Sequence, residues 1–284
     1  DRPLDERVEL KKEFDKLSKD EKETSAFYLA SPGCHVADGR LAEVTYASGD
    51  LLTVEKLYRE RLDLDPRLAV VTGNALITKG EYAHAQEPLR QALKMGGTQT
   101  SARRSLAVLY AEQGDWTTAS RLFERINKVP DWSIGLWLWL EYLEASQGPD
   151  AAMAKAKELA TQFPDDIDAQ LALSRWVSQG SNPELKEQTR TSTEGVFLNR
   201  LERYPRSANV AALYAVWLNL WDSGSDAALA QAEKAKSLGS TATVFWALSQ
   251  VYEARGNTDQ ARQWRNRAAQ DAPGNIGYAR LFVQ

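Results

Sequence analysis

The sequence is poor in the residues that most often catalyse reactions or cross-link chains. Its 284 residues include one cysteine, Cys34, and two histidines, His35 and His84. One cysteine excludes an intrachain disulfide, and no further ligands stand near Cys34 and His35 at the spacing of a zinc site. No phosphate-binding, dinucleotide-binding, metalloprotease or serine-hydrolase motif occurs. We therefore expect no metal, no cofactor and no enzymatic activity.

Long apolar runs and an excess of basic charge are also missing. The most apolar stretch, residues 132–140, is far shorter than the roughly 20 residues that cross a bilayer, so it predicts a buried helix. The 35 basic and 39 acidic side chains give a formal net charge of −4, which provides no general attraction to nucleic acid or anionic lipid. A bacterial periplasm and a reducing cytosol both suit a chain with one cysteine, and of the two we prefer the periplasm.

Glycines followed by small or acidic residues recur along the chain at a nearly constant interval. They are Gly49, Gly80, Gly114, Gly148, Gly180, Gly224 and Gly256. The successive gaps are 31, 34, 34, 32, 44 and 32 residues. A period near 34 residues is typical of repeated helix–turn–helix units, each of which buries its apolar face against its neighbours.

The unit around Gly114 shows why this period predicts helical hairpins. Leu106 and Tyr110 are four residues apart, so they fall on one face of a first helix. Gly114 ends that helix, because glycine adopts a left-handed backbone without strain, and Asp115 can cap the next helix. We expect Ala119 to lie where the two helices cross, so that a larger side chain there would destabilise the fold. The buried face of the second helix is predicted to contain Trp116, Ala119 and Phe123.

This pattern resembles the tetratricopeptide repeat (TPR) family, whose units combine small residues at the hairpin crossing with a turn glycine, aromatic residues and a closing proline. The resemblance covers about residues 35–273 and is strongest around Gly49, Gly80, Gly114 and Gly256. It implies an all-α, right-handed α-solenoid of about seven TPR-like helical hairpins over residues 35–284. The alternative is an irregular helical bundle whose glycines coincide by chance.

Two segments depart from the repeat. Residues 1–34 do not follow the glycine register, and the spacing of Leu10, Phe14 and Leu17 predicts an amphipathic helix. We interpret this segment as N-terminal capping helices or as a degenerate repeat. The gap of 44 residues between Gly180 and Gly224 contains an insertion near residues 181–195, which is polar and lacks an apolar stripe. It is compatible with a longer helix or with a loop on the binding face.

The TPR resemblance also implies that the first helix of each hairpin lines a concave groove. The register of the glycines places Trp137 near one groove position and Glu141 near another, one helical turn later. This mixture of aromatic and polar groups is typical of a peptide-binding surface. The groove candidates are Asn74, Arg104, Trp137, Glu141, Trp246 and Gln250. Some TPR proteins clamp a terminal carboxylate, but Val70 stands where the first lysine of that clamp would be, so we expect no such clamp.

Tryptophans also fill the core between repeat units, so the groove assignment has an alternative. Trp137 packs between units in that interpretation and contacts no ligand. Trp139 lies two residues further along the helix and points elsewhere, so at most one of the two is expected to line the groove.

We expect a protein–protein interaction scaffold or adaptor that binds a partner segment in the groove. Residues 86–93 and the pair Gly96-Gly97 resemble TPR proteins of bacterial envelope, secretion and exopolysaccharide assemblies. Two alternatives stay open: a non-catalytic helical module of a larger enzyme, and a regulatory solenoid that senses a small molecule near Trp137. The expected partner is a protein or peptide rather than nucleic acid, with no direct membrane span, and the oligomeric state is open.

Overall fold

The computed structural model describes residues 66–95, 99–126 and 133–281, and within these ranges every regular element is a helix. The segment 1–34 and the unit around Gly49 lie outside the described residues. The helices are α5 (Pro66–Thr78), α6 (Tyr82–Lys94), α7 (Gln99–Glu112), α8 (Trp116–Ile126), α9 (Ser133–Gln147), α10 (Pro149–Gln162), α11 (Ile167–Gln179), α12 (Pro183–Arg203), α13 (Ala208–Trp221), α14 (Asp226–Leu238), α15 (Ala242–Ala254), α16 (Thr258–Asp271) and α17 (Ile276–Ala279). None of them is long and apolar enough to cross a membrane.

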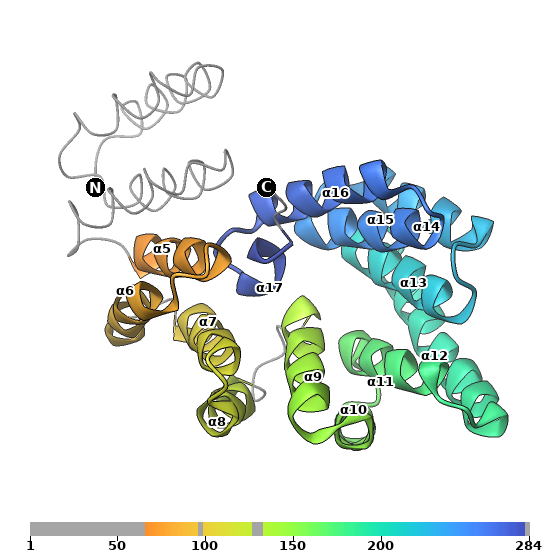
Figure 1. Ribbon diagram of the computed structural model, residues 1–284. Coiled ribbons are helices and arrows are strands. Elements are labelled where there is room, and N and C mark those ends of the chain that lie inside the picture. Colours follow the sequence, from red (N-terminus) through yellow and green to blue (C-terminus); the bar gives the residue numbers. More distant parts are fainter. Residues whose placement is uncertain (1–65, 96–98, 127–132, 282–284) are drawn as a thin grey trace, which may run out of the picture.

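Consecutive helices pack as hairpins, and the hairpins stack in chain order (Figure 1). The pairs are α5 with α6, α7 with α8, α9 with α10, α11 with α12, α13 with α14, and α15 with α16. The first helices of neighbouring hairpins also contact one another; for example, α5 contacts α7, and α13 contacts α15. The predicted all-α solenoid is therefore confirmed over the described part of the chain.

The turns between paired helices follow the predicted chemistry. At Gly114 the backbone φ is +80°, and the Asp115 amide donates to the Tyr110 carbonyl at 2.9 Å, which closes the helix end. The Asp115 carboxylate then accepts the Thr118 amide at 3.0 Å and caps α8. The side-chain and backbone hydrogen bonds from Thr118 lower the pKa of Asp115. Positive φ values also occur at Gly80, Gly148, Gly224 and Gly256.

The polar insertion is part of one continuous helix. Helix α12 has 21 residues, whereas the other paired helices have 11 to 15, so the extra residues lengthen the helix instead of forming a loop. Its inward side carries Thr189 and Thr193 before Phe197, and all three are buried. The Thr193 hydroxyl accepts a hydrogen bond from the Trp217 indole at 2.9 Å and another from Ser174 at 3.1 Å. Because threonine fills this stripe, the segment lacks the apolar pattern of its neighbours.

The interior consists of two apolar clusters, and small residues set how closely the helices approach. A side chain at Gly73 would place its Cβ 2.4 Å from Leu89, so glycine is needed where α5 meets α6. Leu89 belongs to the first cluster, which lies mainly in the N-terminal hairpins, and Ala119 on α8, which is 2% exposed, belongs to it too. Trp139 packs in this cluster against Phe123, at 6.3 Å between ring centroids, while Trp137 belongs to the second cluster.

The stack of hairpins curves back on itself, so that the last helix lies beside the first described ones (Figure 1). Helix α17 contacts α5, α7 and α9 as well as α16. The Asn74 side chain of α5 donates a buried hydrogen bond of 2.8 Å to the carbonyl of Pro273, which is 199 residues away in sequence. We call the side of the first helices that faces α17 the inner face.

Candidate partner-binding site on the inner face

A pocket of about 260 Å³ opens on the inner face between hairpins that are distant in sequence. Helices α9, α11 and α15 contribute to it, together with residues in and just after α17. Its lining residues are Trp137, Leu138, Glu141, Arg175, Trp246, Gln250, Gly277, Arg280 and Leu281. It therefore combines aromatic rings, two guanidinium groups, a carboxylate and an amide.

Two tryptophans form the floor of this pocket. Trp137 on α9 and Trp246 on α15 meet edge to face, with centroids 5.0 Å apart and ring planes at 88°. This geometry directs the positive edge of one ring at the negative face of the other. The two side chains are 6% and 3% exposed, so their pairing also joins the third and sixth described hairpins across the inner face.

Arg175 on α11 links the aromatic floor to the acidic rim. Its guanidinium carbon lies 4.4 Å from the centroid of Trp137, within range of a cation–π interaction. The same guanidinium group is 2.8 Å from a carboxylate oxygen of Glu141. The Glu141 side chain is 45% exposed, so part of its carboxylate remains open to an incoming donor.

Arg280 forms the other charged wall through a connected set of hydrogen bonds. It donates to the Tyr142 hydroxyl at 2.6 Å and lies 2.8 Å from the Glu112 carboxylate. Tyr142 in turn donates to Glu112 at 2.6 Å. Burial raises the pKa of Tyr142 well above its usual range; the nearby positive charge of Arg280 opposes this and the hydrogen bond to Glu112 adds to it. The phenol therefore stays a neutral donor, and Arg280 is held at the edge of the pocket.

The indole nitrogen of Trp137 is an unsatisfied group at this site. It is buried and has no hydrogen-bond partner among the residues that the structure describes. Buried polar groups are nearly always paired, and leaving one unpaired costs about 1–3 kcal/mol.

The structure brings four of the six groove candidates together and separates the other two. Trp137, Glu141, Trp246 and Gln250 all line the pocket. Asn74 is completely buried, and its amide oxygen accepts a 2.6 Å hydrogen bond from Ser105.

Arg104 on α7 is the second candidate outside the pocket, and it is only 4% exposed. Asn74 is covered by the segment that leads into α17, because its side-chain amide donates to the Pro273 carbonyl, and α17 also packs against α7, the helix of Arg104. Arg175 and Arg280 line the pocket but are not among the residues that the repeat pattern predicts. Arg175 lies on α11, which is the first helix of its hairpin, as are the helices of the groove candidates, whereas Arg280 lies beyond the last hairpin and carries no periodic signal.

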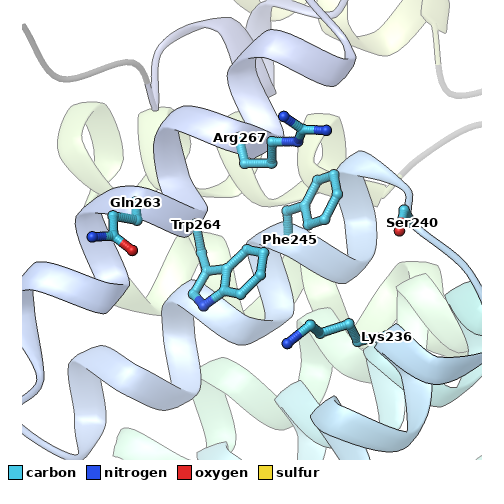
Figure 2. Close-up of a pocket in the computed structure, with 6 residues that line it drawn as sticks. All are labelled: Lys236, Ser240, Phe245, Gln263, Trp264 and Arg267. Atoms are coloured by element: carbon cyan, nitrogen blue, oxygen red, sulfur yellow. The ribbon is translucent and has the colours of Figure 1, made fainter.

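A second pocket, of about 400 Å³, lies between α14, α15 and α16 (Figure 2). Phe245 and Trp264 stack there at 5.6 Å with an angle of 13° between their planes. Lys236 lies 4.9 Å from the Trp264 ring, and Arg267 lies 5.6 Å from the Phe245 ring. Each ring therefore contacts both the other ring and a cation, which leaves less aromatic surface for a ligand. We call these four residues the outer stack.

Comparison with known proteins finds similarity to solved repeat structures. No family model matches the sequence, and no curated protein matches it significantly. The structure is similar to a tetratricopeptide repeat protein from Parabacteroides merdae, with 15% identity, a TM-score of 0.40, and coverage of 84% of this chain and 93% of that one. It is also similar to a thermophilic TPR protein of Thermus thermophilus, with 20% identity, a TM-score of 0.39, and coverage of 63% and 95%. A third similar structure is that of pilF from Pseudomonas aeruginosa, with 16% identity, a TM-score of 0.33, and coverage of 75% and 95%.

Proposed function

We propose that the chain is a non-catalytic interaction scaffold that binds a segment of a partner protein in the inner-face pocket. The observation that carries this proposal is the convergence of Trp137, Trp246, Glu141 and Gln250, from two distant helices, on one pocket. Tryptophan and arginine are enriched among the residues that dominate binding energy at protein interfaces. Here both types lie at the centre of one mixed apolar and charged site.

The size of the pocket favours a partner side chain over a small-molecule ligand. At about 260 Å³ it is smaller than the roughly 300–1,000 Å³ of typical small-molecule sites. It can take one large side chain as an anchor while the flanking backbone contacts the rim. Glu141 and Gln250 stand at that rim, where a carboxylate and an amide can bond the partner's backbone amides or basic groups.

The proposal includes a setting within a bacterial envelope, secretion or exopolysaccharide assembly. Its support is the resemblance of residues 86–93 and Gly96-Gly97 to TPR proteins of such systems. Fractionation of the native cell, followed by identification of proteins cross-linked to the chain, tests this setting. Recovery of cytosolic partners alone would contradict it.

The binding site itself is tested with rim variants that leave the core intact. Glu141→Ala and Gln250→Ala change an exposed and a half-buried side chain, and Arg267→Ala in the outer stack is the matched control. We expect the captured partner to be lost from both rim variants and kept by the control, at unchanged melting temperatures. Equal capture by all three variants would place the binding site elsewhere.

A further inference from the structure

The segment 273–281 lies against the inner face in the manner of a bound peptide. Helix α17 has four residues, whereas the paired helices have 11 to 21. It contacts α5, α7 and α9, which belong to three different hairpins. Ile276, Tyr278 and Ala279 are all buried by these contacts or by α15 and α16.

Three side chains of the segment insert into three different environments. Ile276 is completely buried in the apolar cluster of the N-terminal hairpins. Tyr278 enters the cluster of the C-terminal hairpins, where its hydroxyl lies 2.9 Å from that of Thr243. Arg280 reaches Glu112, with both side chains partly exposed, at 34% and 25%. The segment thus presents an aliphatic, an aromatic and a basic group at positions i, i+2 and i+4.

The backbone of the segment is recognised as well. The Pro273 carbonyl accepts the Asn74 amide at 2.8 Å, and Asn275 caps α17 by accepting the Gly277 amide at 3.1 Å. Asn74 is fully buried, and Ser105 fixes its orientation through the 2.6 Å hydrogen bond. The inner face therefore holds a short turn of helix through a backbone hydrogen bond at one end and an ion pair at the other.

We propose that this segment is an internal ligand, and that a partner segment with the same pattern binds by displacing it. The partner would carry an aliphatic residue, a tyrosine two positions later and an arginine four positions later. This inference rests on the proposed function, because Gly277, Arg280 and Leu281 line the same pocket as Trp137 and Trp246. A tethered ligand acts at a high effective concentration, so an external segment competes weakly until the internal one is released.

Exchange of the segment in trans tests the internal-ligand half of the proposal. A site-specific protease sequence is inserted after Asp271, which is exposed at the end of α16, so that the whole chain is present but nicked. A fluorescent peptide of residues 272–284 is then added to nicked and intact protein, and binding is followed by anisotropy. We expect saturable binding to the nicked protein and at least about tenfold weaker binding to the intact one.

A peptide with Arg280→Glu is the matched control, because it turns the ion pair with Glu112 into a repulsion. We expect it to bind the nicked protein at least about tenfold more weakly than the native peptide. Two results would overturn the proposal: no exchange of the native peptide into nicked protein that keeps its helical circular dichroism, or unfolding of the nicked protein when its segment is diluted away. The second result would show that the segment is a permanent part of the core.

The displacement half is tested with the captured partner. Nicked protein from which the segment has been removed should bind the partner more tightly than intact protein, and the native peptide should compete. Unchanged partner binding together with normal peptide exchange would refute displacement but not the partner-binding site. Equal partner capture by the Glu141→Ala, Gln250→Ala and Arg267→Ala variants, with normal peptide exchange, would instead refute the proposed function.

Discussion

The inner-face pocket and the outer stack contain similar side chains, but the pocket joins distant hairpins whereas the outer stack joins consecutive helices. Each joins two aromatic rings to cationic groups, and neighbouring residues of α15 supply one ring to each: Phe245 to the outer stack and Trp246 to the pocket. The four residues of the outer stack come from three consecutive helices, α14, α15 and α16. In the pocket the two tryptophans come from hairpins that meet only because the solenoid curves back.

This difference indicates which contacts depend on the whole molecule. The outer stack needs only the last hairpins to be folded, since its first and last members, Lys236 and Arg267, are 31 residues apart. The Trp137–Trp246 pair needs α9, α11 and α15 to be placed correctly together. We therefore expect truncation of the buried pocket tryptophans to affect global stability, whereas changes in the outer stack should stay local.

The largest expected effect is that of removing a pocket tryptophan. Trp246→Ala should destabilise the protein by about 3–5 kcal/mol, because the side chain is 3% exposed and its loss leaves a cavity beneath Trp137. Trp264→Ala in the outer stack should cost about 1–2 kcal/mol, because that ring is only half-buried. Urea denaturation of both variants measures the difference, and equal losses would show that the two regions do not differ in this way.

A smaller loss is expected where α5 holds the C-terminal segment. Asn74→Ala leaves the buried Pro273 carbonyl without its donor, which should cost about 1–3 kcal/mol. Ser105 still has the Ser101 carbonyl as an acceptor at 3.0 Å, so its hydroxyl is not left unpaired. Chemical denaturation gives the free energy, and peptide exchange should become faster in the same variant. Unchanged stability would mean that this hydrogen bond does not hold the segment.

The charged wall of the pocket should make stability depend on alkaline pH. Burial raises the pKa of Tyr142 above the value near 10 that the residue has in an unfolded chain. The folded state then keeps a proton that the unfolded state loses, so the stabilisation is complete below about pH 10 and falls as the pH rises further. Tyr142→Phe should show a shallower fall, measured by urea denaturation from pH 9 to 11. An identical slope in both proteins would show that Tyr142 does not cause it.

The smallest effect is expected in the outer stack. The Lys236 side chain is 41% exposed, and its contacts are the Trp264 ring and a 3.2 Å ion pair with Glu233. Exposed contacts of both kinds contribute at most about 1 kcal/mol, so Lys236→Ala should shift the melting temperature by a few degrees at most. Partner capture should be unchanged. A large loss of either would mean that the outer stack is coupled to the inner face.

The repeated sequence pattern predicted the helices and their turns. It could not predict features that occur only once in the chain, such as the packing of α17. The turn at Gly114 and the cap by Asp115 follow from local backbone chemistry, and the structure confirms both. The register of the glycines also predicted that Trp137 and Trp246 lie on the same surface, and both line one pocket. The burial of Asn74 was not predictable in this way, because its partner, the Pro273 carbonyl, lies in a segment outside the period. Whether the pocket residues bind a partner stays a prediction.

A second feature that the sequence pattern did not predict is the buried polar face of α12. The stripe of Thr189 and Thr193 on α12 is polar in sequence but buried in the structure, since Thr193 satisfies the Trp217 indole. Hydrophobic periodicity alone cannot detect a buried face that is built on hydroxyl groups. Such a face becomes recognisable only when its hydrogen-bonding partner on the next hairpin is known.

The hydrogen bond between Asn74 and Pro273 has a consequence for how the molecule unfolds. In an open array of repeats each unit touches only its neighbours, so the terminal units fray first and cooperativity decays with distance. A contact across 199 residues removes that freedom, because the last hairpin cannot detach without breaking its link to α5. It also raises the mean sequence separation of native contacts, and a higher contact order slows folding. Amide hydrogen exchange in α15 and α16 should therefore report opening of the whole array rather than loosening of one end.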